Sequence, residues 1–297
     1  MFPIRPVHLI VPFGADGAAD RVARVVAAGL SEQWGHEVRV ENRPGNGAVD
    51  GTSYAARAVA DGHSLLFGTS TTHCIAPLLR AGLPYAPERD FAPVGLIGWA
   101  PNLVLVRKGL ADSVAALIEA ARSASPPLRY ASAGTGQTIH LSAVLFERMA
   151  GVRMAHVPFE TGSAAGLAAL VRGEVDVMFD NILGCRDALR RGAVRALAVA
   201  GSLRSSALPD LPTLDECGLS GYRADIWLGL FAPGETPARV LSELRRALGV
   251  VLGQTDVVSH LRECGLMLDF CSGEDFSKEV AANRAAWQSL IESCEPR

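Results

Sequence analysis

The chain has no apolar run that could span a membrane and no block of charge of one sign. Its apolar stretches fall well short of the roughly 20 residues that a transmembrane helix needs. The net charge at pH 7 is −3, from 28 Lys and Arg against 31 Asp and Glu. Nucleic acid is therefore not expected as a partner, because it requires a basic surface. With 297 residues, of which 49% are hydrophobic, the chain is long enough for two globular cores.

The signatures of metal centres and of common hydrolases are also missing. The six cysteines include no C-x-x-C pair, and His260, Cys264 and Cys271 follow no common zinc spacing. Neither a G-x-S-x-G nor an H-E-x-x-H motif occurs. We therefore expect scattered thiols, no metal and no cofactor, although an even number of cysteines permits disulfides.

No secretion signal is visible at the start of the chain. The first residues, MFPIRP, are not a basic segment followed by an apolar one. Two interpretations stay open at this point: a cytoplasmic protein, or the mature form of an exported protein whose leader has been removed.

The sequence does contain a regular alternation of short apolar runs with helical patterns. Candidate strands are Val7–Val11, Glu37–Val40, Ser64–Gly68, Leu103–Val106, Leu128–Ala131, Ala155–Val157, Val175–Phe179 and Val194–Ala200. Apolar stripes at helical spacing are Val22, Val25, Val26 and Leu30, and, within Gln137–Ala150, Leu141, Leu145 and Met149. Such alternation predicts an α/β fold of mostly parallel sheets flanked by helices.

The pattern changes after about Asp225. One more strand, Trp227–Ala232, precedes long helical segments at Ala238–Leu252, Asp256–Cys264 and Glu274–Ser293. If this tail returns to the first sheet, the chain crosses twice, near Pro101–Val106 and Tyr222–Leu228. We therefore expect a discontinuous first lobe, 1–101 with 225–297, and a second lobe, 102–224. Two crossings make a hinge, and a ligand is expected in the cleft between the lobes.

Loops rich in Gly, Ser and Thr follow four of the candidate strands. They are Phe13–Gly17, Gly68–His73, Ser132–His140 and Pro158–Ser163. Ligands bind at the carboxyl ends of strands in α/β sheets, where hydroxyls and the free amides of helix N-termini suit a carboxylate or another small anion. The same residue types are ordinary in loops and caps, but four such loops in order favour a ligand site.

Several polar residues near these loops admit two interpretations. Asp16 would repel an anion, but it could pair with an ammonium group, or it could cap a helix and face solvent. His73 and His140 could be ligand donors or a base, or they could tie loops together. Asp180, with Asn181 after it, could fix a ligand or a water, or cap the next helix.

At these loops the chain resembles the TctC/Bug family of extracytoplasmic solute receptors, the binding component of tripartite tricarboxylate transporters. The segments that carry the resemblance run in order along nearly the whole chain: Ile10–Asp20, Val40–Gly47, Asp61–His73, Tyr85–Val94, Tyr130–Phe146, His156–Asn181, Arg195–Leu219 and Trp227–Pro237. The resemblance implies a two-lobe periplasmic-binding-protein fold of the type II-like Venus flytrap kind. It also implies a periplasmic location, integral-membrane permease subunits as partners, a monomer, and capture of a solute without chemistry.

In this family, the ligand carboxylate is held mainly by backbone amides, hydroxyls and ordered waters. Carried over to this chain, the ligand-binding residues are Phe13, Gly14, Ala15, Asp16, Gly17, Ser70, Thr71, Thr72, His73, Gly134, Thr135, Gly136, Thr138, Thr161, Gly162, Ser163 and Asp180. One position departs from the family, whose first loop typically reads Ala/Pro-x-Gly-Gly where this chain has Asp16. That difference makes an amino acid, an amide or another carboxylate with a donor group more attractive than a plain dicarboxylate or tricarboxylate.

Other function classes have weaker support. The glycines of Glu41–Gly51 mimic a dinucleotide fingerprint, but the strand before them is short and polar and no acidic strand end follows to hold a ribose. A small-acid lyase or transferase on the same scaffold would use His140 or Asp180 as its base. A receptor that presents its closed state to a membrane kinase would share every feature of a transport receptor.

Overall fold

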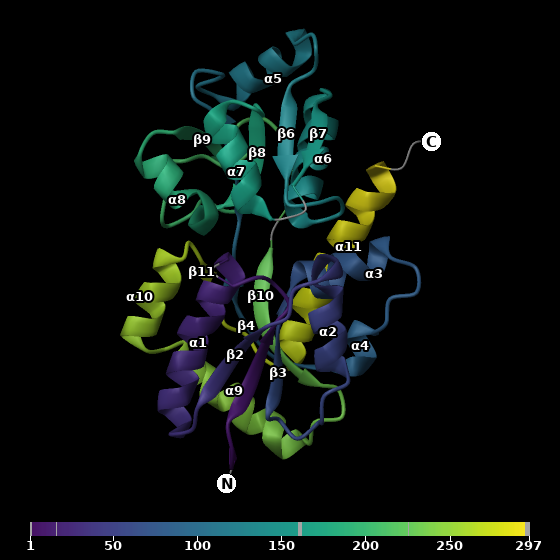
Figure 1. Ribbon diagram of the computed structural model, residues 1–297, viewed down its shortest axis with the longest axis vertical. Helices are drawn as coiled ribbons and strands as arrows, with labels where there is room; N and C mark the ends of the chain where they lie inside the picture. Colours follow the sequence, from purple (N-terminus) through teal and green to yellow (C-terminus); the bar gives the residue numbers. More distant parts are fainter. Residues whose placement is uncertain (1, 16, 160–161, 225, 295–297) are drawn as a thin grey trace. The chain divides into compact units, whose positions relative to one another are not determined.

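The computed structural model describes residues 2–15, 17–159, 162–224 and 226–294. The chain divides into two compact units. Unit 1 is Met1–Trp99 with Trp227–Gln288, and unit 2 is Ala100–Ile226 with Ser289–Arg297. Each unit is an α/β layer structure with a sheet of its own (Figure 1).

Unit 1 is built on a six-stranded sheet in the order β11-β4-β10-β3-β1-β2. Its strands are β1 (Val7–Val11), β2 (Val38–Asn42), β3 (Ser64–Thr69), β4 (Phe91–Trp99), β10 (Trp227–Pro233) and β11 (Met267–Leu268). β1 pairs in parallel with β2 and β3, whereas β10 runs antiparallel to β3 and β4, and β11 antiparallel to β4. Val7, Leu9, Ile10 and Val11 of β1 are fully buried, because helices cover both faces of the sheet there.

Helices cover both faces of this sheet (Figure 1). α1 (Ala18–Trp34) packs with α9 (Ala238–Val251) and α10 (Thr255–Glu263). The other helical segments are α2 (Val49–Ala56), α3 (Ala76–Leu79), α4 (Pro87–Asp90), α11 (Glu274–Cys294) and the short turns η1 (Asn46–Ala48) and η2 (Thr71–Ile75). Phe276 of α11 is fully buried against the rings of Trp227 and Phe231, with centroids 5.4 and 5.1 Å away. The C-terminal helix therefore completes the core of unit 1.

Unit 2 is built on a five-stranded sheet in the order β7-β6-β8-β5-β9. Its elements are β5 (Asn102–Arg107), α5 (Val114–Ser123), β6 (Arg129–Ser132), α6 (Thr138–Ala150), β7 (Ala155–Pro158), α7 (Ser163–Arg172), β8 (Val177–Asn181), α8 (Ile182–Arg190) and β9 (Val194–Val199). β6 pairs in parallel with β7 and β8, and β5 runs antiparallel to β8 and β9. The rings of Phe146 and Phe179, 5.8 Å apart, lie in the core.

The predicted α/β class with flanking helices is confirmed. Both sheets are mixed, because β10 and β11 in unit 1 and β5 in unit 2 run against the other strands of their sheets. β4 leaves unit 1 and β10 returns to it; the two are neighbours and run in opposite directions. β4 was not among the predicted strands. Its burial is nearly continuous from Val94 to Gly98 rather than alternating, and an unbroken apolar run does not by itself distinguish a strand from a helix.

The buried face of α6 also differs from the predicted stripe. Leu145 and Met149 are only half-buried, whereas Phe146 and the polar Ser142 are fully buried. The Ser142 hydroxyl donates to the Thr138 carbonyl and accepts from Asn102. A buried serine satisfied in this way is invisible to a search for apolar periodicity.

Five of the six cysteines lie among the described side chains, and no disulfide joins any two of these five. Two of them, Cys74 and Cys185, are buried as expected, and the others are half-buried. Within the described ranges, no three His, Cys, Asp or Glu side chains come together to hold a metal ion. No helix over the same ranges has the length and apolar character to cross a membrane.

Candidate functional site

In unit 1, two of the predicted loops lie at the same edge of the sheet. β1 and β3 are parallel neighbours, so the segments that follow them meet at their carboxyl edge. The loop after β1 exposes Gly14, Ala15 and Gly17, and then enters α1, whose first amides have no partner within the helix. Gly14, Ala15 and Gly17 have little or no side chain, so at these described positions the loop presents mainly backbone, as expected of an anion-binding turn.

A buried acid that sequence analysis did not single out anchors this loop. The Asp20 carboxylate accepts from Arg24 Nε (2.9 Å) and Asn42 Nδ2 (2.8 Å). The Asn42 amide also donates to the carbonyl of Phe13 (3.2 Å). Asp20 thereby ties the β1 loop to the end of β2. Two features of the sequence could have indicated this anchor: Asp20 is an acid in the first turn of a helix, and Asn42 is a polar residue near the end of a strand.

The loop after β3 is held by its own hydroxyls. Ser70 Oγ accepts from the backbone amide of Trp227 (3.0 Å). Thr72 Oγ1 accepts from the Thr69 amide and lies 2.8 Å from His73 Nδ1. Ser70 and Thr72 are fully buried, whereas Thr71 is half-exposed. Of these three residues, Thr71 is the one that is partly exposed to solvent.

The ring of His73 belongs to the core rather than to a surface that a solute could reach. It is 2% exposed and stacks on Phe231 with centroids 3.9 Å apart, beside Phe91 and Trp227. Burial lowers the pKa of His73 to about 3, so the ring is neutral. We therefore correct the expectation that the His73 side chain binds the ligand. The ring packs in the core like an aromatic residue, and only the backbone of His73 is available to a ligand at this loop.

In unit 2, three of the predicted segments share one edge of the sheet. β6 lies between β7 and β8, parallel to both, so the residues after all three strands meet at their carboxyl edge. α6, α7 and α8 each begin there. Their N-termini carry partial positive charge and unpaired amides. Gly134 (φ 120°) and Gly162 (φ 114°) adopt backbone conformations that side chains disfavour, and so bring the chain round to these helices.

Two histidines and a serine support the loop after β6. Ser132 Oγ lies 2.6 Å from His156 Nε2, and the His156 ring lies 4.3 Å from that of His140. His140 Nδ1 accepts from the amide of Gly136 (3.2 Å). Burial and the neighbouring His156 lower the pKa of His140 to about 4. A neutral His140 that accepts from the backbone ties the loop together, which is one of the two interpretations considered for it. His156 was not singled out from the sequence.

Asp180, at the end of β8, is fully buried at this edge. Its Oδ1 accepts from the backbone and side-chain amides of Asn181, while Oδ2 has no hydrogen-bond partner among the described residues. Burial raises the pKa of Asp180 to about 7, against the weaker opposing effects of Asn181 and the nearby Ser163 hydroxyl. Gly184 leaves room for the carboxyl group, because a Cβ there would lie 2.8 Å from Oδ2. The cap of α8 is Asn181, whose side chain accepts from the Gly184 amide.

The remaining predicted residues divide by exposure. Thr135 is exposed, Gly162 and Ser163 are half-buried, and Thr138 is 9% exposed. Asp16 and Thr161 lie outside the described residues. Within each unit, the described members of the predicted set lie at one sheet edge, those of unit 1 after β1 and β3 and those of unit 2 after β6, β7 and β8.

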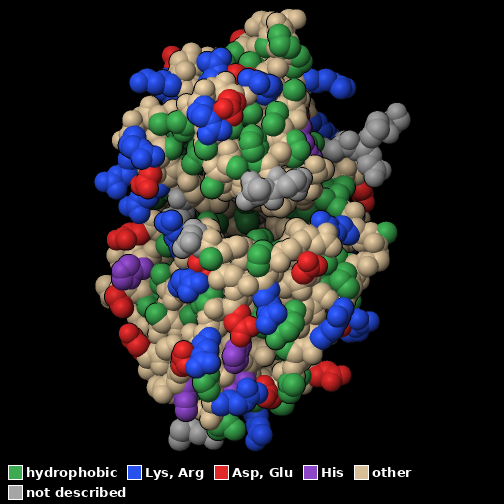
Figure 2. All heavy atoms as spheres, in the orientation of Figure 1, with side chains coloured by type: hydrophobic (Ala, Val, Ile, Leu, Met, Phe, Trp, Pro, Cys, Tyr) green, Lys and Arg blue, Asp and Glu red, His purple; other side chains and the backbone are tan. Residues whose placement is uncertain are grey.

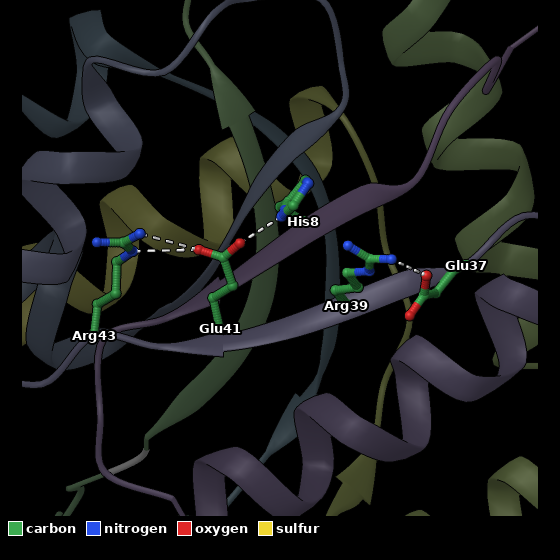
Figure 3. A network of polar contacts seen from close by, with 5 residues as sticks. All are labelled: His8, Glu37, Arg39, Glu41 and Arg43. Carbon is green, nitrogen blue, oxygen red and sulfur yellow. Dashed lines mark hydrogen bonds and ion pairs between the residues drawn. The ribbon is translucent and has the colours of Figure 1, made fainter.

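A pocket of about 760 Å³ lies elsewhere on unit 1, where α2 covers only part of the sheet. It is lined by Arg5, His8, Ile10, Glu41, Asp50, Ser53, Tyr54, Arg57, Ala58, Val59, Ser64 and Pro84. Figure 3 shows His8 and Arg43 on either side of Glu41, with Arg39 paired separately to Glu37. These polar side chains pair with one another on a face of the sheet that is open to solvent. No predicted site residue lines the pocket.

These edges can be compared with known proteins. The model of the tripartite tricarboxylate transporter family receptor matches residues 22–295. The chain belongs to this family. Receptors of this family bind substrates outside the cytoplasm. The chain is 36% identical over 295 residues to the UPF0065 protein in the tcbD-tcbE intergenic region of Pseudomonas sp. strain P51, covering 98% of this chain and 86% of that protein. It is 32% identical to protein BugT of Bordetella pertussis, covering 98% and 89%.

Solved receptor structures share the fold over the whole chain. R. palustris Rpa4515 with adipate superposes with a TM-score of 0.92 at 36% identity, covering 99% of this chain and 98% of that one. MatC of Rhodopseudomonas palustris with bound malate gives 0.86 at 34%, covering 98% and 100%. The periplasmic binding protein BugD gives 0.88 at 31%, covering 99% and 98%. The periplasmic-binding-protein fold predicted for this receptor is thus confirmed.

Proposed function

We propose that this receptor captures a small carboxylate-bearing solute in the periplasm and delivers it, chemically unchanged, to integral-membrane permease subunits. The observation that carries the proposal is the convergence of the N-termini of α6, α7 and α8 on one sheet edge of unit 2. Amides and hydroxyls at such an edge bind a carboxylate without a buried counter-charge. Adipate and malate in two solved relatives support the same ligand class.

The carboxyl-edge loops of both units are proposed to act on one solute. Release remains feasible because neutral donors bind an anion less strongly than a paired cation would. Closure requires that the solute bind the closed state more tightly than the open one. Asp16 is proposed to favour a solute that also carries a donor group.

Isothermal titration calorimetry with adipate, malate and an α-amino dicarboxylate tests the proposal. Thr71→Ala in unit 1 and Ser163→Ala in unit 2 should each weaken binding of the same solute by about tenfold or more, the effect of one hydrogen bond to a charged group. Ser113→Ala is the matched control, because Ser113 caps α5 at the opposite edge of unit 2. If the substitution in only one of the two units weakened binding, the proposal that both units act on one solute would be wrong.

Mass spectrometry of the solute after incubation separates the receptor from an enzyme. The receptor should return one molecule per chain with its mass unchanged. Conversion of the solute, lost on substitution of His140 or Asp180, would indicate catalysis instead. For Asp16, the Asp16→Gly variant should shift preference from the amino dicarboxylate toward the plain one, and an unchanged preference would remove Asp16 from the proposal.

A further inference from the structure

Four cations gather at one corner of unit 2, at the edge opposite the predicted ligand loops. α8 starts at the carboxyl edge and ends at Arg190, with Arg191 as its cap. Arg195 is the second residue of β9, and Lys108 follows the end of β5. Because β5 runs antiparallel to β8 and β9, its end and the start of β9 lie at the same edge, with Arg107 paired to Val194. We call Lys108, Arg190, Arg191 and Arg195 the basic corner.

The cations of the basic corner are exposed and have no ion pair or side-chain hydrogen bond with the described residues. Some exposed arginines elsewhere are ion-paired, as Arg172 is with Glu174 and Arg246 with Glu243, whereas others, such as Arg57 and Arg239, have no ion pair with the described residues. Figure 2 shows blue side chains gathered over the α8 and β9 side of unit 2. The nearby acid on α8 is Asp187, one turn before Arg190. Arg107, the residue before Lys108, forms an ion pair with Asp176, with 2.8 Å between Nε and Oδ1.

Helix capping explains only part of this cluster. Cations at the end of α8 interact favourably with its dipole, which accounts for Arg190 and Arg191. Arg195 and Lys108 belong to strands and gain nothing from that helix. Four unpaired cations repel one another, and the local repulsion is relieved when an anionic surface approaches.

We propose that the basic corner is a docking surface for a membrane rich in anionic phospholipids. Protein interfaces are built around apolar or aromatic anchors. The large apolar side chains exposed in the described part of unit 2 are Val171 and Leu203, and neither lies on α8 or β9. Adsorption to lipid phosphates needs only cations within a Debye length. The proposal rests on the proposed function, because delivery of a solute to membrane permease subunits is what brings this receptor close to a membrane.

Co-sedimentation with vesicles tests the proposal on the full chain. At low salt, the protein should bind vesicles of phosphatidylglycerol mixed with phosphatidylcholine, and not phosphatidylcholine alone. Replacing all four basic-corner residues with Ala should lower partitioning by about tenfold or more, since each cation near an anionic surface contributes about fivefold. The control replaces Arg5, Arg39, Arg89 and Arg246, which are ion-paired residues of unit 1, and should change partitioning by less than about twofold.

Three outcomes would overturn the proposal. One is equal loss in the two four-residue variants, which would mean that net charge rather than the corner is sensed. Another is displacement by inorganic phosphate at constant ionic strength, which would indicate a discrete anion site. The third is binding of polyglutamate without binding of vesicles, which would indicate an acidic protein partner. The assay contains no solute, so failure of solute binding would overturn the proposed function and leave this result intact.

Discussion

At the scale of single residues, Asp180 gives the clearest prediction of how the free energy of unfolding depends on pH. An unfolded Asp ionises near its ordinary pKa of about 3.9, whereas burial raises the pKa of Asp180 in the fold to about 7. Between these values the folded state binds the extra proton, so the contribution of Asp180 to the free energy of unfolding falls as pH rises and is flat above about pH 7. Asp180→Asn keeps the size of the side chain and removes the titration.

Urea denaturation of both proteins measures this effect. Relative to wild type, the free energy of unfolding of Asp180→Asn should rise by about 2–3 kcal/mol between about pH 5 and about pH 8. All other titrating groups are common to the two proteins and cancel in the difference. A difference that does not change with pH would mean that Asp180 is ionised throughout.

The anchor of the β1 loop leads to a second prediction at this scale. Asp20→Ala leaves the amide of Asn42 and the guanidinium of Arg24 without the buried carboxylate that they share. We expect a loss of about 1–3 kcal/mol in the free energy of unfolding, together with weaker solute binding because the loop is released. Glu119→Ala removes an exposed partner of Arg122 and should cost less than about 0.5 kcal/mol. Chemical denaturation and calorimetry measure the two effects, and equal losses in both variants would show that Asp20 is no anchor.

At the scale of elements, the packing of α1 depends on a position without a side chain. A Cβ at Gly29 would lie 2.6 Å from Val251 Cγ1 of α9 and 3.3 Å from Val257 of α10. Gly29→Ala should therefore destabilise unit 1 by about 1–3 kcal/mol, although alanine is the better helix former. Thermal denaturation measures the change.

Gly249 of α9 is the matched control for Gly29. A Cβ there meets the ring of Phe270 at 3.1 Å, and this ring is 42% exposed and free to move. Gly249→Ala should be neutral or stabilising by up to about 1 kcal/mol. If both substitutions stabilise the protein, the close contact between α1 and α9 has been overestimated.

At the scale of the whole molecule, the tryptophans report on one unit. All four, Trp34, Trp99, Trp227 and Trp287, belong to unit 1. Phe146→Ala opens the core of unit 2 and should cost about 3–5 kcal/mol there. Without solute, we expect circular dichroism to show an early transition in the variant while the midpoint of tryptophan fluorescence stays unchanged. Saturating solute should bring the two transitions together. A fluorescence midpoint that moves with the dichroism would show that the units unfold as one.

Much of the architecture is readable from local pattern. Apolar runs and helical spacing are properties of a few neighbouring residues, so β1, β10 and the helices after β10 lie close to their predicted positions. The four loops rich in Gly, Ser and Thr were equally visible, because each follows a strand directly. β4 was missed because its continuously buried stretch, Val94–Gly98, has no alternation to detect.

The sequence by itself determined the α/β class, the family and the loops that follow the strands, since these depend on residues adjacent in the chain. Only the tertiary structure decided strand direction, the core position of the His73 ring and the anchoring role of Asp20. The charge state of Asp180 was also decided there. The physical reason is that burial and hydrogen-bond partners come from segments distant in the chain, as Phe231 does for His73 and Asn42 for Asp20.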